Sequence, residues 1–329
     1  DEVSPNTRLA LMTSNPRFHC VEGRDWPRFC AALTRGRPLV VRPGMGSYNE
    51  TSLRGLQYAL DSVKIVRACV PEGSVLLTEV ENFPFTRYSK SAAFTFLQMA
   101  VSAALGCEGA TLNIFDHRGT PMRQEGHYGR MMADEKDFLD ALAAYARRPG
   151  AFRGVRVLHH DKAAYHNHAR SKEPYHPFIN DDEHSYQLLE SHGIATVYDE
   201  ASPIVAASGQ ILRSYDDEAV ETMLSNGLLL DGAAARVLHE RGYGNDLGLK
   251  DIGEPVKLFE DYANGPYAAE EFFNPNFGGA PKCYLTTILP GLPRQTTFRF
   301  FKPAHEACVV TRLVDPDAAV KAPALTVHE

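Results

Sequence analysis

Two glutamates stand two residues apart at the end of a short apolar stretch, Val75–Val80 (VLLTEV), and are the residues of this sequence best suited to chemistry. The stretch has the length and composition of a buried β-strand. Residues two apart on a strand face the same side, so Glu79 and Glu81 are expected to point together toward the interior of the fold. Carboxylates in such a place are costly to bury unless they are paired or hydrogen-bonded.

Glycoside hydrolysis uses such carboxylates, because one of them attacks or stabilises the anomeric carbon and another protonates the leaving oxygen. Glu79 and Glu81 are not expected to form that pair, since both come from one strand and would approach a sugar from one side. The alternative is a structural ion pair with Arg42 or Arg87. The sequence NFP directly after Glu81 favours the catalytic interpretation.

Glu81 lies within a succession of strand and helix patterns. Short apolar runs that alternate with amphipathic segments are typical of βα units. The expected strands are Arg8–Thr13, Pro38–Arg42, Val75–Val80 and Gly109–Phe115, and the expected helices are Asp25–Leu33, Thr51–Val66 and the strongly apolar Ser89–Leu105. Four such units make half of a (β/α)₈ barrel, since a full barrel takes roughly 250 residues. A doubly wound sheet would use the same elements.

Polar residues at the C-terminal ends of these strands favour the barrel, because barrel enzymes build their sites from the C-terminal ends of several strands. The fold class is therefore α/β, with residues 1–150 as half of a barrel. Besides Glu81, the residues that offer the hydrogen-bonding groups needed by a sugar are Arg42, Tyr48, Glu79, Asn82, Asn113 and Asp116.

A second α/β domain, residues 151–278, and a C-terminal β segment, residues 279–329, are expected to follow a connecting helix at Glu135–Arg147. The second domain offers no cysteine on a strand-to-helix elbow and no other nucleophile with a base. Its expected strands are Gly154–His159, Ala195–Tyr198, Pro203–Ala206 and Gly227–Leu230, its helices Ser185–His192, Asp216–Leu224 and Ala233–Arg241, and the C-terminal strands Lys282–Leu289 and Thr296–Phe301.

The run LLTEVENFP resembles the seventh-strand motif of the large glycosidase clan with (β/α)₈ barrels. The closest resemblance is to bacterial β-galactosidases that combine a barrel, a trimerisation domain and a small C-terminal β domain. Their seventh strand ends in a nucleophilic Glu three residues before a Pro, which implies Glu81 before Pro84 in this chain. The four expected strands would then be barrel strands five to eight. The runs PFINDDEHSYQLLESHGIATVYDEAS and NGLLLDGAAARVLHERGYGNDLGL resemble the amidotransferase-like trimerisation domain.

The resemblance implies a retaining glycoside hydrolase of β-linked sugars, plausibly β-galactosides, that forms a homo-oligomer. This clan carries its acid/base Glu after an Asn at strand four, and the chain is expected to start at strand five. The acid/base residue is therefore expected outside this chain, in a missing N-terminal half or a separate polypeptide. The alternative is a non-catalytic carbohydrate-binding or scaffold protein with the same fold.

The net charge, the apolar runs and the spacing of cysteines and histidines argue against several other classes of protein. A net charge of −7 argues against a nucleic-acid partner, and no apolar run approaches the roughly 20 residues that span a bilayer. The start of the sequence does not have the pattern of a signal peptide, and the six cysteines are scattered singly, which favours reduced thiols and the cytoplasm. The histidines at 159, 160, 166, 168, 176 and 184 lack a metal-site spacing, and no phosphate-binding motif occurs. No metal and no cofactor are expected.

Overall fold

The computed structural model describes residues 10–13, 16–19, 23–35, 37–45, 50, 53–82, 88–116, 118–168, 188–190, 192–199, 202–257, 269–272, 283–285, 297–314 and 319–329. The chain forms two compact units. The first unit comprises Asp1–Asn180 and Leu188–Pro203, and the second comprises Asp181–Gln187 and Ile204–Glu329. The domain boundaries expected at residues 150 and 278 remain predictions.

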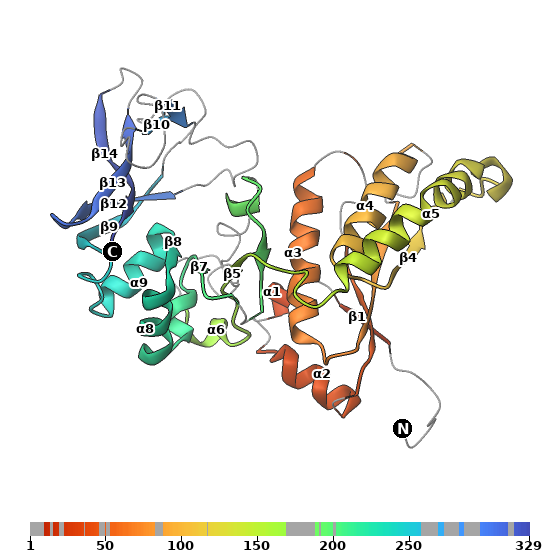
Figure 1. Cartoon of the computed structure of the whole chain (residues 1–329), viewed down its shortest axis with the longest axis horizontal. Coiled ribbons are helices and arrows are strands. Elements are labelled where there is room, and N and C mark those ends of the chain that lie inside the picture. Colours follow the sequence, from red (N-terminus) through yellow and green to blue (C-terminus); the bar gives the residue numbers. More distant parts are fainter. Residues whose placement is uncertain are drawn as a thin grey trace. The chain divides into compact units, whose positions relative to one another are not determined.

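The first unit is built on a four-stranded parallel sheet (Figure 1). Its strands are β1 (Ala10–Thr13), β2 (Val40–Pro43), β3 (Val75–Glu81) and β4 (Gly109–Asn113), each close to its expected position. They lie in the order β1-β2-β3-β4, so strands that are consecutive in the chain are neighbours in the sheet. This order has no reversal of direction, whereas a doubly wound sheet reverses at its switch point. The α/β class is confirmed.

Helices alternate with these strands as expected. They are α1 (Pro16–His19), α2 (Trp26–Thr34), α3 (Leu53–Cys69), α4 (Ala92–Ala104) and α5 (Gly126–Ala146), with a 3-10 turn, η2, at Met122–Gln124. Two of them begin at a side-chain cap, because Asp25 accepts from the Arg28 N–H at 3.0 Å and Ser91 accepts from the Phe94 N–H at 3.0 Å. Helix α5 begins earlier than its expected start at residue 135.

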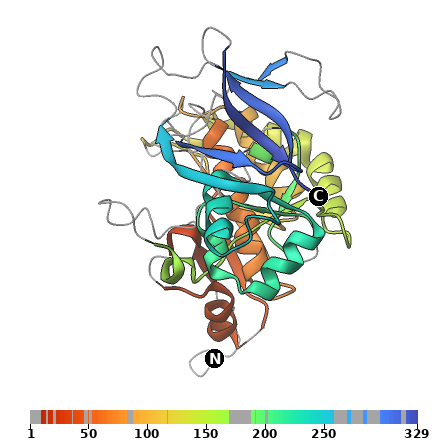
Figure 2. The ribbon, with the colours of Figure 1, turned by 90° about the vertical axis from the view of Figure 1, so that its left-hand side faces the viewer.

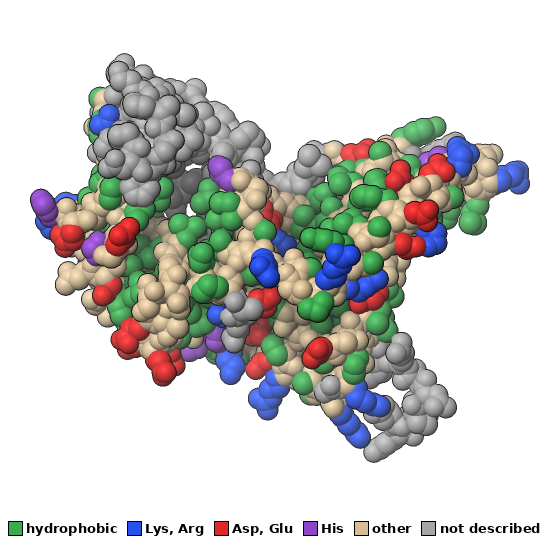
Figure 3. All heavy atoms as spheres, in the orientation of Figure 1, with side chains coloured by type: hydrophobic (Ala, Val, Ile, Leu, Met, Phe, Trp, Pro, Cys, Tyr) green, Lys and Arg blue, Asp and Glu red, His purple; other side chains and the backbone are tan. Residues whose placement is uncertain are grey.

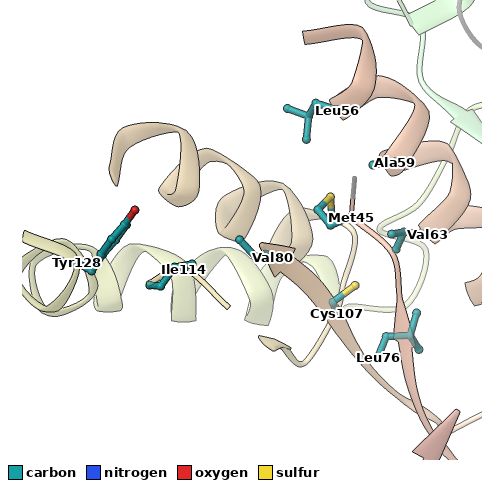
Figure 4. Close-up of a cluster of buried hydrophobic side chains, with 9 residues drawn as sticks. All are labelled: Met45, Leu56, Ala59, Val63, Leu76, Val80, Cys107, Ile114 and Tyr128. Atoms are coloured by element: carbon teal, nitrogen blue, oxygen red, sulfur yellow. The ribbon is translucent and has the colours of Figure 1, made fainter. Parts of the chain in front are cut away.

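The core of the first unit lies between the sheet and these helices (Figure 4). Leu76 and Val80 of β3 are buried in one cluster with side chains of α3, Tyr128 of α5 and Met45. Val41 of β2 is buried in a second cluster with Trp26 and Cys30 of α2. Because side chains alternate along a strand, the residues between these positions project from the opposite face of the sheet.

The remainder of the first unit contains β5 (Val155–Val157), α6 (Ala163–His166) and β6 (Thr196–Val197), and β5 pairs with β6 in parallel. The described part of the expected helix Ser185–His192 is helical at residues 188–190. A buried polar network joins this region to the helices, because Tyr198 donates a hydrogen bond to Asp61 of α3 and accepts one from Arg17 of α1 at 3.0 Å. Arg17 also forms an ion pair with Asp61.

The second unit begins with parallel strands β7 (Val205–Ala207) and β8 (Leu228–Leu230), which pair with each other. A 3-10 turn, η4 (Ile211–Ser214), and the helices α8 (Asp217–Asn226) and α9 (Gly232–Glu240) complete this part. Asp216 caps α8 by accepting from the Ala219 N–H at 2.9 Å, as the acidic start of this helix predicts.

Antiparallel strands occupy the C-terminal part of the second unit, where the long final strands appear in blue in Figure 2. Strands β10 (Ala269–Phe272), β11 (Cys283–Leu285), β13 (Cys308–Val314) and β14 (Val320–Val327) form one sheet in the order β11-β10-β13-β14, and β9 (Leu249–Lys257) pairs with β12 (Thr297–Pro303). The strands expected near 283 and 297 are confirmed. However, β9 and β10 show that the antiparallel region starts before residue 279.

Candidate functional site

The candidate site lies on the face of the first unit's sheet that is opposite Leu76 and Val80. Burial alternates along β3, with Leu76, Thr78 and Val80 buried and Glu79 and Glu81 half-buried. The two glutamates therefore share one face, as strand alternation predicts. Glu79 and Glu81 do not belong to the core that packs against the helices. Their carboxylates can therefore contact groups that pack against this face of the sheet.

Arg42 projects from the same face, because its neighbour Val41 is buried on the helix side. An isolated parallel bridge pairs Gly44 with Glu79 and so brings the C-terminal end of β2 beside β3. Arg42 and Glu79 form an ion pair in which the Glu79 side chain is 14% exposed and that of Arg42 is 32% exposed. The ion pair expected from the sequence is thus made by Glu79.

Glu79 and Glu81 stand two residues apart on this face of β3, so their carboxyl groups are neighbours. Burial raises the pKa of Glu79 above its ordinary value of 4.5, the nearby Glu81 raises it further, and Arg42 acts in the opposite direction. Glu79 therefore holds its proton more strongly than an ordinary glutamate does.

Strand β4 borders the glutamates on their other side. In the parallel register, Glu79 lies opposite Thr111 and Glu81 opposite Asn113. Three adjacent strands therefore carry expected site residues on one face, and these residues are Arg42, Glu79, Glu81 and Asn113.

Two other expected site residues have local structural contacts. Asn82 is 1% exposed, and its backbone N–H donates to the Asn113 carbonyl at 3.0 Å, so it joins the ends of β3 and β4. Asp116 accepts from the Thr120 hydroxyl at 2.5 Å and from the Arg118 and Thr120 N–H groups, so it holds the turn after β4. Tyr48 lies outside the described residues.

Sequence reasoning missed Lys90, which lies between β3 and α4. Lys90 is 3% exposed, donates to the backbone carbonyl of Glu81, and donates to Gln98 Oε1 at 2.6 Å. Burial lowers the pKa of Lys90 from 10.5 to about 8, although Glu81 and Glu50 act to raise it. A lysine directly before the helix-capping Ser91, with Gln98 two turns later, is the signal that could have identified it.

Chemically, the pair can supply a nucleophile or base from one carboxylate and a proton from the other. Both groups come from β3, so they reach a substrate from the same side. In a retaining glycosidase the acid and the nucleophile lie roughly 5–5.5 Å apart on either side of the scissile bond. A complete site of that kind needs a further carboxyl group from outside β3.

A hollow of about 150 Å³ lies along α3. Its two cations already have partners, because Lys64 pairs with Glu190 and Arg67 lies over the Phe152 ring at 4.1 Å. The hollow is lined by Val63, Lys64, Arg67, Ala68, Leu105, Phe152, Thr196, Val197, Tyr198 and Asp199. We assign it no function.

In the part of the chain that the structure describes, no three His, Cys, Asp or Glu side chains are grouped as metal ligands. Among the helices of the same residues, none combines the length and hydrophobicity needed to cross a bilayer.

Comparison with known proteins does not assign the chain to a family. No family model matches it, and no curated protein matches it. The resemblance to glycosidases therefore depends on the residues themselves, above all on Glu79, Glu81 and the strand that carries them.

Proposed function

We propose that this chain is part of a retaining glycoside hydrolase that acts on β-linked sugars such as β-galactosides, with Glu81 as the nucleophile. The observation that carries the proposal is the position of Glu81 at the C-terminal end of a parallel strand, on the same face as Glu79. Glu79, paired with Arg42, would orient the Glu81 carboxylate. Asn113, opposite Glu81 in β4, would bind a sugar hydroxyl.

We further propose that the four-stranded sheet is strands five to eight of a (β/α)₈ barrel. Four parallel strands in sequential order support this, because a barrel keeps this order all the way round. The face of Glu79 and Glu81 would then be the barrel interior. Parallel sheets are normally covered on both faces, so a complementary half, from the same or another polypeptide, would cover this one and supply the acid/base residue.

The alternative is a carbohydrate-binding or scaffold protein that shares the fold. It is favoured by one observation: in the described residues of β1 to β4, the acidic side chains on this face, Glu79 and Glu81, belong to a single strand. Without an acid from elsewhere, the site would bind a sugar and not cleave it.

A fluorinated sugar with a strong leaving group tests for the nucleophile. We expect 2,4-dinitrophenyl 2-deoxy-2-fluoro-β-D-galactoside to label Glu81, because this leaving group departs without a general acid and the fluorine slows release of the covalent intermediate. Mass spectrometry of the peptide that contains Glu81 measures the adduct.

Two variants serve as controls. Glu81→Gln should remove the label, because the amide cannot attack the anomeric carbon. Glu79→Gln should retain it, because the amide still donates a hydrogen bond to Glu81. Labelling of Glu81→Gln at the wild-type level would exclude Glu81 as the nucleophile. Sugar binding by calorimetry without any label would instead favour the binding protein.

A further inference from the structure

Helix α2 lies at one edge of the first unit's sheet. It connects β1 to β2, and in the described residues β1 is the last strand on this side. Its buried side chains Trp26 and Cys30 pack in one cluster with Val41 of β2 and Val66 of α3. In a barrel the helices form a closed outer ring, so the proposed complementary half would place a helix beside α2 on the side away from α3.

Part of the apolar surface of α2 is exposed. Phe29 is 36% exposed and Leu33 is 37% exposed, and residues four apart share one side of a helix. Each of them follows a buried residue of α2 by three positions, which places the exposed stripe about 60° round the helix from the buried one. Single exposed apolar side chains are ordinary. These two continue the buried surface, so the apolar side of α2 is wider than the part that the core covers.

Positive charge borders this stripe. Residues 24–37 contain four arginines and one acidic residue, which caps the helix, in a chain whose net charge is −7. Arg28 and Arg35 are exposed, and within the described residues neither of them forms an ion pair. The guanidinium group of Arg24 lies over the Phe29 ring at 5.5 Å, and Figure 3 shows basic side chains around α2. The surface therefore combines exposed apolar side chains with uncompensated positive charge.

Arg35 has a backbone conformation that an arginine does not favour. It ends α2 with a φ of 56° and a ψ of 39°, and it is the one described non-glycine residue with a positive φ. Glycine or asparagine usually takes this left-handed position after a helix, because a Cβ atom is unfavourable there. Backbone strain of this kind often marks a functional position, and an exposed arginine can contribute there through its charge.

We propose that the surface formed by Arg28, Phe29, Leu33 and Arg35 docks an acidic amphipathic helix of the half that completes the sheet beyond β1. Phe29 and Leu33 pack against the apolar stripe of that helix, and Arg28 and Arg35 pair with carboxylates that flank the stripe. Charge complementarity selects this partner, because a basic helix would be repelled by both arginines. The inference rests on the proposed barrel and deepens it by naming the chemistry of one contact with the complementary half.

Fluorescence of Trp26 tests the proposal on the full chain, because Trp26 is the only tryptophan and its ring meets the Phe29 ring edge-on at 5.7 Å. The probe is a stapled helical peptide with one leucine stripe flanked by glutamates. This peptide should bind saturably, whereas the same peptide with lysines in place of the glutamates should not bind. A peptide of identical composition with its leucines spread round the helix should bind about tenfold more weakly, because fewer of them can pack against Phe29 and Leu33.

Charge reversal locates the binding. Arg28→Glu combined with Arg35→Glu should weaken binding of the glutamate peptide by about tenfold, the combined effect of two exposed ion pairs, and should allow the lysine peptide to bind. Arg147→Glu combined with Arg148→Glu, at the exposed end of α5, changes the net charge equally and is the matched control. It should keep the wild-type affinity. Equal weakening by the two double variants would overturn the proposal, since the peptide would then respond to net charge alone.

Arg35→Gly separates docking from folding. Glycine relieves the left-handed conformation, so this variant should melt at a higher temperature than the wild type and still bind the glutamate peptide more weakly. Unchanged affinity would overturn the role of Arg35 in docking. If the charge-reversed variant does not fold, Arg28→Ala combined with Arg35→Gly takes its place.

Two further outcomes are decisive. Binding of phosphatidylserine vesicles in place of the peptide, lost on charge reversal of Arg28 and Arg35, would overturn the proposal in favour of a membrane surface. The assay involves no sugar, so failure of the fluorosugar labelling would leave peptide binding intact. Labelling of Glu81 without any peptide binding would overturn the docking surface and leave the nucleophile in place.

Discussion

The surroundings of Glu79 determine how its carboxyl makes the free energy of unfolding depend on pH. Because its pKa is raised above 4.5, the folded chain holds this proton to higher pH than the unfolded chain does. The resulting contribution to the free energy of unfolding is present below pH 4.5 and is lost as the pH rises through the raised pKa. Glu79→Gln should remove this loss. Urea denaturation over a series of pH values measures it, and a slope equal to that of the wild type would contradict the prediction.

Glu240 should show the opposite sign. Hydrogen bonds from Arg236 and Arg213 lower its pKa from 4.5 to about 2. Its contribution to stability is therefore present above pH 4.5 and is lost as the pH falls through about 2. We expect Glu240→Gln to flatten the acid side of the stability profile and to leave the neutral side unchanged in shape. The same denaturation series reports this, and full retention of the acid loss would assign it to other groups.

At the scale of elements, two aspartates that cap helices of the second unit should differ in how much each stabilises the fold. Asp216 caps α8 through the Ala219 N–H. Asp231 caps α9 through the Ala234 N–H at 2.7 Å and also accepts from the Gly209 N–H at 3.0 Å, after β7. We expect Asp216→Ala to cost about 1 kcal/mol of unfolding free energy and Asp231→Ala to cost about 1 kcal/mol more, for the extra bond. Urea denaturation of the two variants makes the comparison, and equal losses would show that the bond to Gly209 contributes nothing.

Helix α4 illustrates what sequence can and cannot predict about an element. Its existence and extent follow from composition, and the structure confirms a helix at Ala92–Ala104. Its sequence is apolar as expected, but the buried residues include the polar Thr95, Gln98 and Ser102 beside Phe94 and Ala103. Which side of the helix meets β3 is a property of the tertiary structure and does not follow from composition.

The candidate site was likewise predictable only in part from the sequence. Strand alternation is a local rule, and it is sufficient to place Glu79 and Glu81 on one face of the sheet. The contact of Lys90 with the Glu81 carbonyl was not predictable, because it joins residues nine apart through the tertiary structure. Strand β9 was not predicted, because Gly253 and Pro255 interrupt the alternating sequence pattern of a strand. The segment is a strand through its pairing with β12, which is a tertiary contact.

At the scale of the whole chain, apolar surface marks where further partners would bind. In the first unit, Figure 3 shows hydrophobic side chains gathered over α4 and α5, where Leu97 and Phe138 are exposed. Leu112 on the edge strand β4 is exposed as well. Leu112 lies on the edge at which the proposed barrel would continue, so we attribute its exposure to the proposed complementary half and not to self-association.

Self-association is instead proposed for the second unit, on its resemblance to a trimerisation domain. Its strand β8 consists of three half-buried leucines, Leu228–Leu230, which pair with β7 on one side. In the described residues β8 is the last strand of its sheet, and uncharged apolar edge strands favour association between chains. We expect light scattering at micromolar concentration to show an oligomer. Leu229→Lys should shift it toward monomer, since a lysine protects a sheet edge, whereas Leu112→Lys on β4 should not. A strict monomer in the wild type, or equal effects of the two lysines, would contradict association through β8.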